Sequence, residues 1–309
     1  MGNTFYFNWE VSLMEFLQAH LGKFGIAFAS FCSTLGQEMV MIAVLGFFYW
    51  AWDKKCGKHI GLNIVVGGVL FPMIKNIALR RRPYMDHPSI QCLKKVDADA
   101  DIMDIAAQGY SFPSGHATNS MLAYGSVAQY QKKKPITIIV TIVIALIGIS
   151  RFCVGVHYPT DVLCGWALGL IVMAIIPRLS AIIKKDWVLF LILLVVGLPG
   201  FFYCTSNDFY TSYGMMLGGF MGFLFEERYV NFEGTRKPLQ IVLRVVIGAG
   251  LFFALNTALK LPFSSAFLDS GTTAALLVRT FRYAIVIFLL IGVYPLSFKL
   301  LDKIGQKRG

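Results

Sequence analysis

The chain has 309 residues, of which 56% are hydrophobic, and its mean hydropathy is +0.64. Soluble domains contain roughly 45 to 50% apolar residues even when glycine is counted, so this composition excludes an ordinary soluble protein and indicates a protein of the lipid bilayer. A net charge of +11 is also typical of nucleic-acid-binding proteins, but the basic residues here form short clusters between apolar runs, which membrane topology explains better.

Residues 1–22 mix aromatic and aliphatic side chains with polar ones, which predicts an amphipathic helix that lies at the membrane interface and does not cross it. Nine apolar segments are then candidates for membrane spans. The first runs from residue 24 or 38 to 52, and the others cover 60–79, 117–130, 136–149, 162–176, 187–203, 210–225, 241–259 and 283–301. Several are short, so helix tilt or burial by neighbouring helices is implied. The predicted fold class is all-α, an integral membrane bundle of about nine transmembrane helices.

Two further features of the chain bear on this arrangement. Small residues at three- and four-residue spacing favour close helix packing in the seventh segment: Gly214, Gly218, Gly219 and Gly222. The sequence also predicts three regions, namely the interfacial helix 1–22, a core of residues 23–185 that contains the polar stretches described below, and C-terminal transmembrane helices in 186–309.

The basic residues predict the orientation of the bundle. After the first, third, fifth and seventh segments and at the C-terminus lie 17 of the 28 basic residues: Lys54, Lys55, Lys58, Lys132, Lys133, Lys134, Arg178, Lys184, Lys185, Arg228, Arg236, Lys237, Arg244, Lys299, Lys303, Lys307 and Arg308. By the positive-inside rule this face is cytoplasmic, which puts the N-terminus outside and the C-terminus inside. We also expect no cleaved signal peptide, because no basic region precedes an apolar core at the N-terminus.

One polar stretch follows the fourth apolar segment and contains Ser150, Arg151, His157 and Asp161. If a helix starts near Pro159, the carboxylate of Asp161 can hold one imidazole nitrogen of His157 and leave the other with a free lone pair. That arrangement orients a histidine base or nucleophile. A capped helix start with a chance pair of side chains explains this segment, taken alone, about equally well.

A second polar stretch lies at the end of the apolar segment 60–79. Lys75 precedes Arg82 by seven residues, or two helical turns, so we expect both cations on nearly the same face of one helix. A cation at bilayer depth costs about 2.5 to 3.5 kcal/mol on insertion scales, which makes these two candidates for function. Arg80 and Arg81 are interpreted as anchors at the membrane interface.

A third polar stretch, Pro113 to His116, precedes the apolar segment 117–130. Ser114 and Gly115 at the start of a helix would offer a hydroxyl and unpaired backbone amides to an anion, and His116 adds a titratable group. Alone, this stretch is better explained as a turn with a helix cap. Together, the three stretches supply three cations, an anion-binding helix start and two histidines, which suits a phosphate dianion.

In chain order, the three stretches resemble the complete signature of the type 2 phosphatidic acid phosphatase superfamily: Lys75-x6-Arg82-Pro83, then Pro113-Ser114-Gly115-His116, then Ser150-Arg151-x5-His157-x3-Asp161. The resemblance covers roughly residues 60–175. It implies a helical core shared with lipid phosphate phosphatases, undecaprenyl diphosphate phosphatases, glucose-6-phosphatases and soluble vanadium haloperoxidases. It further implies that His157 is the nucleophile, that Asp161 orients it and that His116 is the general acid. The groups implied to hold the phosphoryl oxygens are Lys75, Arg82, Ser114, Gly115 and Arg151.

The expected function is hydrolysis of a lipid or polyprenyl phosphate or diphosphate at the outer face of the cell membrane, through a phosphohistidine intermediate. No cofactor is expected, and no metal, because fixed cations supply the charge that Mg²⁺ provides in many other phosphoryl transfers. The expected partners are the substrate and the bilayer but no nucleic acid, and a homodimer is left open.

Three alternatives stay open. The nine-segment layout resembles the glucose-6-phosphatase branch, whose substrate is a soluble phosphate ester. The phosphoryl group could also go to another lipid instead of water. A non-enzymatic protein could hold an anionic lipid with the same cations, although it would need no nucleophile. A haloperoxidase is disfavoured, because nine apolar segments have no role in a soluble vanadate enzyme.

Overall fold

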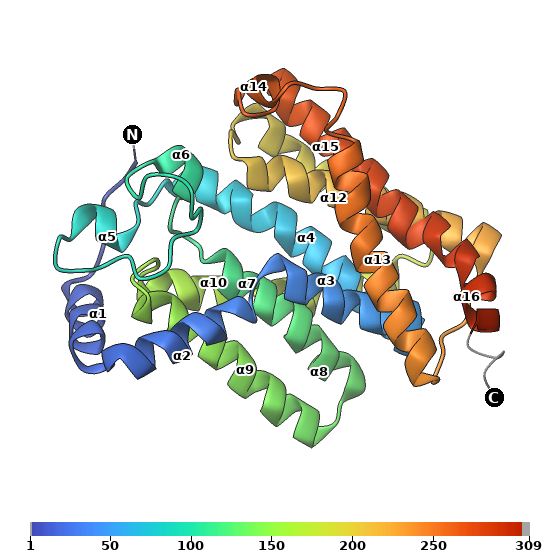
Figure 1. Cartoon of the computed structure of the whole chain (residues 1–309), viewed down its shortest axis with the longest axis horizontal. Coiled ribbons are helices and arrows are strands. Elements are labelled where there is room, and N and C mark those ends of the chain that lie inside the picture. Colours follow the sequence, from blue (N-terminus) through green and yellow to red (C-terminus); the bar gives the residue numbers. More distant parts are fainter. Residues whose placement is uncertain (1, 305–309) are drawn as a thin grey trace. The chain divides into compact units, whose positions relative to one another are not determined.

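A computed structural model describes residues 2–304, in which every named element is a helix (Figure 1). Within this part of the chain, extended backbone pairs at one isolated bridge, between Asn3 and Arg80. The expected all-α class is confirmed. The helices pack into two compact units: the first contains the residues up to Met41 and Leu70–Ala174, and the second contains Ile42–Val69 and the residues from Ile175 on.

The first unit holds the N-terminal helices and the middle of the chain. Its helices, some of which continue into the second unit, are α1 (Asn8–His20), α2 (Gly22–Thr34), α3 (Glu38–Gly46), α4 (Lys54–Ala78), α5 (Pro83–Asp86), α6 (Ile105–Gln108), α7 (Gly115–Ser120), η2 (Met121–Gly125), α8 (Ser126–Gln131), α9 (Lys134–Cys153) and α10 (Pro159–Ile182). In this unit α9 packs against α2 and α7 (Figure 1).

Local sequence explains where these helices begin. Ser114 caps α7 with its side chain, and proline occupies the first turn of α9 and of α10, where its missing N–H costs no hydrogen bond. The prediction of a helix starting at Pro159 is confirmed. Although α9 is rich in isoleucine and valine, which are mediocre helix formers in water, it runs unbroken for 20 residues. A bilayer favours this, because backbone groups there must be satisfied within the segment.

The second unit contains the start of α4 and the C-terminal helices. Its other elements are η1 (Phe47–Trp52), α11 (Asp186–Gly197), η3 (Leu198–Phe202), α12 (Asn207–Phe225), η4 (Glu226–Val230), α13 (Pro238–Ala258), α14 (Ser265–Leu268), α15 (Thr273–Phe288), η5 (Leu289–Val293), η6 (Tyr294–Ser297) and α16 (Phe298–Ile304).

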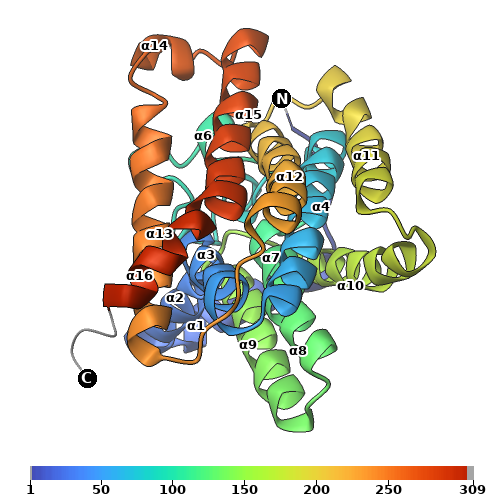
Figure 2. The same ribbon diagram turned by 90° about the vertical axis from the view of Figure 1, so that its right-hand side faces the viewer.

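Close contact between α12 and α15 forms the main packing of the second unit (Figure 2). A Cβ atom on Gly214 or Gly218 would clash with the backbone carbonyl of Thr280 or Ala284 on α15. The close packing predicted from the glycine spacing is thus confirmed at these two positions.

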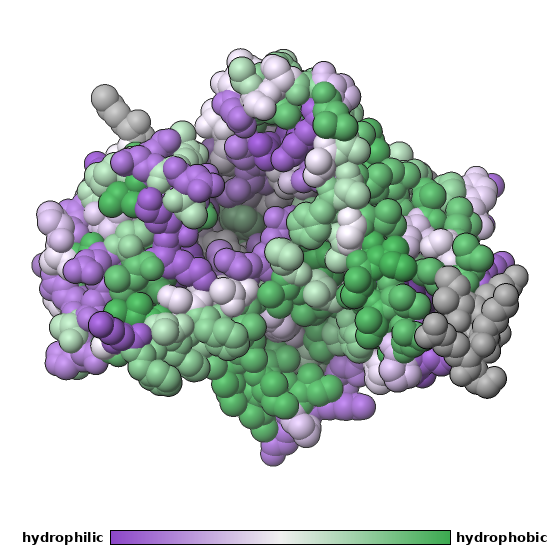
Figure 3. Space-filling model, viewed as in Figure 1, coloured by the Kyte–Doolittle hydropathy of each residue, from purple (hydrophilic) through white to green (hydrophobic). Residues whose placement is uncertain are grey.

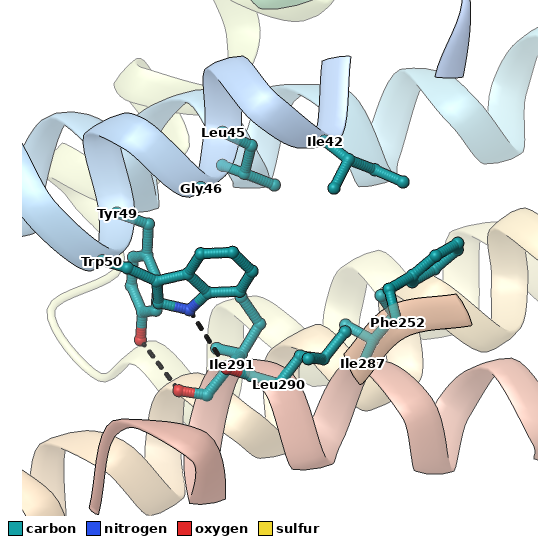
Figure 4. Close-up of a pocket in the computed structure, with 9 residues that line it drawn as sticks. All are labelled: Ile42, Leu45, Gly46, Tyr49, Trp50, Phe252, Ile287, Leu290 and Ile291. Atoms are coloured by element: carbon teal, nitrogen blue, oxygen red, sulfur yellow. Dashed lines mark hydrogen bonds between the residues drawn. The ribbon is translucent and has the colours of Figure 1, made fainter. Parts of the chain in front are cut away.

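A small apolar cavity of about 50 Å³ lies in the second unit (Figure 4). The polar atoms on its lining are already engaged: Trp50 Nε1 donates to the Leu290 carbonyl at 3.1 Å, and the Tyr49 hydroxyl donates to the Ile291 carbonyl at 3.4 Å. The remaining lining residues are Ile42, Leu45, Gly46, Phe252 and Ile287. This cavity therefore offers nothing to a phosphate group.

All nine predicted apolar segments correspond to helices, but fewer are long and apolar enough to cross a membrane. Five described helices meet that test, namely Lys54–Ala78, Lys134–Cys153, Pro159–Ile182, Pro238–Ala258 and Thr273–Leu301, and a sixth span results if the bent pair Gly22–Thr34 and Glu38–Trp52 counts as one. The segments 117–130, 187–203 and 210–225 lie in helices outside this set. The number of spans, nine, and the orientation of the termini stay predictions.

Exposed apolar side chains support membrane contact in each unit. Figure 3 shows hydrophobic residues over α9 and over α13. The exposed apolar residues of these two helices include Ile138, Ile139 and Ile142 on α9 and Val242, Val246 and Phe253 on α13, each more than 40% exposed. The predicted division of the chain into regions 1–22, 23–185 and 186–309 also stays a prediction. Residues 305–309, which include the basic residues Lys307 and Arg308, lie outside the described part of the chain.

Candidate active site

All eight predicted site residues lie in the first unit, in or directly before the five helices α4, α5, α7, α9 and α10. Lys75 is in the last turns of α4 and is buried, with Nζ 5.4 Å from the centroid of the Phe71 ring. The helix ends at Ala78, and Leu79 adopts a positive φ of 50°. Arg82 follows as the N-cap of α5. The prediction that Lys75 and Arg82 share one helical face is therefore wrong, because the helix stops between them.

The buried side chain of Arg82 is held in a fixed orientation by backbone carbonyls. Its Nε donates to the carbonyls of Gln108 and Gly109 at 3.0 Å each, Nη2 donates to Gln108 at 2.7 Å, and Nη1 donates to Val156 at 2.8 Å. Nη1 also lies 3.4 Å from Nε2 of His157. The structure thus brings Arg82, from the polar stretch after residues 60–79, to His157, from the polar stretch after the fourth apolar segment.

Ser114 and Gly115 open α7, and His116 follows in its first turn. The backbone N–H of Ser114 donates to the carbonyl of Asp161 at 3.0 Å, which ties the start of α7 to the start of α10. Ser114 Oγ accepts from the N–H of Ala117 at 3.4 Å, so it caps the helix while its own proton is available for another acceptor. The helix cap and a phosphate-binding role are therefore compatible.

Arg151 ends up buried near the C-terminus of α9. Its Nη1 donates a short hydrogen bond to Ser33 Oγ on α2, whereas its Nε has no hydrogen-bond partner among the described residues. An unpartnered buried guanidinium N–H is costly, and a phosphate oxygen is the kind of acceptor that would satisfy it.

His157 precedes α10 and lies beside Asp161 as the four-residue spacing predicts. Nδ1 of His157 is 3.5 Å from Oδ2 of Asp161, which is within ion-pair distance, but Nδ1 makes no hydrogen bond within the described part of the chain. Catalytic hydrogen bonds are often long before substrate binds. With Nδ1 facing the carboxylate and Nε2 facing Arg82, Nε2 is the nitrogen placed among the cations.

In the absence of substrate, both histidines are held in the neutral form. Burial lowers the pKa of His157 well below its ordinary value, and the charges of Arg82, Arg151 and Lys75 lower it further. Burial likewise lowers the pKa of His116, and Arg151 and His157 add to the effect. A neutral imidazole has the lone pair that a nucleophile needs, so the arrangement can attack an electrophilic phosphorus.

Arg80, interpreted above as an interface anchor, is instead buried with 1% exposure. It forms ion pairs with Glu10 at 2.8 Å and with Asp161 at 2.6 Å. Arg81 is half-buried and pairs with Asp86 at 3.2 Å. The interpretation is wrong for Arg80 because two buried carboxylates, one of them from α1, surround its guanidinium.

A further cation near the site, Lys94, was not predicted. Its Nζ donates to the carbonyl of Ser30 at 2.8 Å, one turn before Ser33, the residue that binds Arg151. Burial and the charge of Arg151 lower the pKa of Lys94. Its sequence context, a loop with another lysine beside it, contains no signal that distinguishes it from a solvated surface residue.

Comparison with known proteins supplies independent information on family. A family model described as the PAP2 superfamily matches residues 57–184, and one described as the transmembrane extension of PAP2 superfamily phosphatases matches residues 210–307. PAP2 is the type 2 phosphatidic acid phosphatase superfamily that the three polar stretches resemble, so the resemblance is confirmed. No solved structure gives a significant match.

Several characterised proteins are similar to the chain. A decaprenylphosphoryl-5-phosphoribose phosphatase from Mycobacterium tuberculosis is 33% identical over 54% of this chain and 88% of its own length. An undecaprenyl-diphosphatase from Sulfolobus acidocaldarius is 30% identical over 45% of this chain and 63% of its own. A phosphatidylglycerophosphatase B from Bacillus subtilis is 36% identical over 25% of this chain and 42% of its own. The chain thus matches only part of the length of the last two.

Proposed function

The chain belongs to the PAP2 superfamily, and from this premise we propose that it is a membrane-embedded phosphatase that hydrolyses a lipid or polyprenyl phosphate through a phosphohistidine on His157. The observation that carries the proposal is the placement of His157, with Nδ1 3.5 Å from the Asp161 carboxylate and Nε2 3.4 Å from the Arg82 guanidinium. One nitrogen faces a group that stabilises an imidazolium, and the other faces a group that binds a phosphate oxygen.

The proposed reaction has two steps. The bound phosphate dianion raises the pKa of His116, which is protonated in the complex. Nε2 of neutral His157 attacks phosphorus, the bond to the leaving oxygen breaks, and the protonated His116 gives its proton to the departing alkoxide. Asp161 stabilises the positive charge that develops on the His157 ring. His116, now neutral, then takes a proton from water, the resulting hydroxide attacks phosphorus, and the N–P bond breaks to release inorganic phosphate and neutral His157.

The phosphoryl oxygens are held by groups that the fold fixes in advance. Arg82 and Arg151 are buried and anchored by carbonyl and hydroxyl oxygens, so little reorganisation is needed when a dianion arrives. Lys75, the Ser114 hydroxyl and the backbone N–H of Gly115 complete the proposed set of donors. Because these residues supply the positive charge, we propose that the reaction needs no metal ion.

The relatives support an amphiphilic substrate. Three of them are named for a decaprenylphosphoryl sugar phosphate, an undecaprenyl diphosphate and a phosphatidylglycerophosphate. The exposed apolar faces of α9 and α13 would keep the protein in the bilayer with such lipids. We further propose that the site faces the extracytoplasmic side of the cell membrane, because the basic loops predict the opposite face as cytoplasmic.

Phosphate release by the purified protein in detergent tests this function. The substrates are phosphatidic acid, undecaprenyl diphosphate, sphingosine phosphate and glucose 6-phosphate, each with EDTA present, and His157→Ala is the control variant. We expect release from at least one lipid substrate, no loss with EDTA and none from His157→Ala. Release from glucose 6-phosphate alone would reassign the substrate class, and activity that survives His157→Ala would contradict the mechanism.

A further inference from the structure

A row of three buried charges lies directly behind His157, on the side away from the phosphate-binding cations. Arg80 is 1% exposed, and Glu10 and Asp161 are fully buried. One arm of the guanidinium, Nη2, donates to Glu10 Oε2 at 2.8 Å, and the other, Nη1, donates to Asp161 Oδ1 at 2.6 Å. A single arginine therefore bridges a carboxylate from α1 and the carboxylate that faces the candidate nucleophile.

The contacts of Asp161 fix which oxygen faces His157. Oδ1 is taken by Arg80, while Oδ2 accepts a short hydrogen bond from Ser111 Oγ and another from the N–H of Tyr158 at 2.7 Å. The carboxylate is consequently held in one orientation, with Oδ2 3.5 Å from Nδ1 of His157.

Glu10 in turn fixes Arg80 and the start of α10. Its Oε1 accepts from the N–H of Thr160 at 3.0 Å and from the Thr160 hydroxyl at 2.6 Å, and its Oε2 also accepts from the N–H of Phe7 at 2.9 Å. Thr160 is the residue before Asp161, and its hydroxyl accepts from Arg80 Nη1 at 2.8 Å. Both oxygens of Glu10 are therefore fully engaged.

The N-terminal segment encloses Arg80 along its whole length. Asn3 exchanges backbone hydrogen bonds with Leu79 and Arg81, at 2.7 and 2.9 Å, and Arg80 Nε donates to the Phe5 carbonyl at 2.8 Å. The guanidinium also lies 3.9 Å from the centroid of the Tyr158 ring. These contacts hold the guanidinium of Arg80 between Glu10 and Asp161.

The charges explain why two acidic residues share one arginine. Arg80 alone would neutralise Asp161 and weaken its attraction for a cationic His157 ring. With Glu10 on its other side, the row carries one net negative charge, and Asp161 is held firmly while it still favours the imidazolium.

We propose that Glu10 and Arg80 are positioning residues of the phosphatase, which hold Asp161 aimed at His157 and keep the net charge behind the nucleophile negative. The N-terminal segment is thus part of the support of the active site as well as a contact with the membrane interface. This inference rests on the function proposed above, since it assigns a role in the same reaction.

The test variant is Glu10→Gln, which removes the charge and keeps the shape of the side chain. The matched control is Glu15→Gln, the same change at an exposed position of α1. Both full-length variants are assayed with whichever of the four substrates above the wild type cleaves fastest. We expect Glu10→Gln to lower kcat with little change in KM, and to move the acidic limb of the kcat/KM profile to lower pH by about one unit, because one negative charge near His157 is removed. The other charged groups that face His157, namely Lys75, Arg82, Arg151 and His116, are unchanged.

Glu10→Asp is a second test variant, which keeps the proposal testable if Glu10→Gln folds poorly. It keeps the charge but shortens the side chain, so we expect a lower kcat with the acidic limb unmoved. Kinetics of either folded Glu10 variant that match Glu15→Gln, or a change confined to KM, would overturn the positioning role. Failure of the proposed function looks different, because the wild type itself would then be inactive or His157→Ala active.

Discussion

At the scale of single residues, the site is a concentration of charge that folding alone would not favour. Arg82 and Arg151 are each 2% exposed, and taking such a group out of water costs several kcal/mol after relaxation. Hydrophobic side chains of similar size would usually be at least as stable. The cations are therefore best understood as prepared for an anionic ligand, which would recover the desolvation cost on binding.

The lowered pKa values of the two histidines predict a characteristic pH dependence. In the free enzyme His157 is neutral well below pH 6.5, its ordinary pKa, so we expect the acidic limb of kcat/KM to lie below that pH. A bound phosphate dianion adds negative charge beside both rings and raises both pKa values. The two limbs of kcat should consequently lie at higher pH than those of kcat/KM.

Both profiles can be measured by phosphate release, with correction for the titration of the substrate itself. Lys95→Gln, at an exposed lysine whose Nζ bonds a loop carbonyl, is a suitable control for general charge effects. An acidic limb of kcat/KM at or above pH 6.5, or limbs of kcat that shift downward, would contradict the neutral-histidine site.

The predicted and the unpredicted residues differ in how they are recognised. Lys75, Arg82, His116 and His157 are polar groups at the ends of apolar segments, where their cost makes them visible in the sequence. Glu10 is 70 residues from Arg80 in the sequence, and it lies in a stretch whose pattern predicts an amphipathic helix. Its role exists only once α1 packs against the rest of the first unit, so no local pattern could reveal it.

At the scale of helices, the approach of α10 to α7 sets the position of the turn at Ser114, which we propose binds phosphate. A Cβ on Gly165 of α10 would be 2.7 Å from the Ser114 carbonyl oxygen and 3.0 Å from Ala117 Cβ. The absence of a side chain at Gly165 therefore permits the hydrogen bond between the Ser114 N–H and the Asp161 carbonyl.

Gly165→Ala should displace the start of α7 and reduce kcat about tenfold or more, since a misplacement of about 1 Å can cost about a hundredfold. Gly169→Ala, one turn later on the same helix, is the matched control, because its Cβ would contact the Met121 side chain instead of the turn at Ser114. Both changes should lower the thermal unfolding temperature to a similar extent. Equal kcat values in the two variants would contradict this role of Gly165.

The helices also show where local reasoning stops. The starts of α7 and α10 follow from Ser114 and Pro159, whose preferences act within one turn. The end of α4 at Ala78 does not follow from its composition, because the chain leaves the helix there to pair with Asn3 near the N-terminus. A long-range contact therefore separates Lys75 and Arg82 into different elements.

At the scale of the whole molecule, the central question is which side of the membrane the site faces. If α9 spans the bilayer, its start after Lys133 and its end before His157 lie on opposite faces. The basic cluster at Lys132–Lys134 then predicts that its own face is cytoplasmic and that the loop containing Ala98 is outside.

Cysteine labelling in intact cells tests this topology. Ala98→Cys and Lys133→Cys, both at exposed positions, are placed singly in a background without the six native cysteines. A membrane-impermeant maleimide should label Ala98→Cys in intact cells and Lys133→Cys only after lysis. The reverse pattern would place the site on the cytoplasmic face, and labelling of both in intact cells would contradict a span at α9.

The most direct test of the central claim is to trap the covalent intermediate. The enzyme is mixed with substrate labelled with ³²P on the transferred phosphoryl group, quenched in alkali within milliseconds and digested for peptide mapping. We predict label on the peptide containing His157, stable in alkali and released by mild acid, as expected for a phosphohistidine, and absent from His157→Ala. Turnover without any labelled peptide, or label on a different residue, would contradict the mechanism.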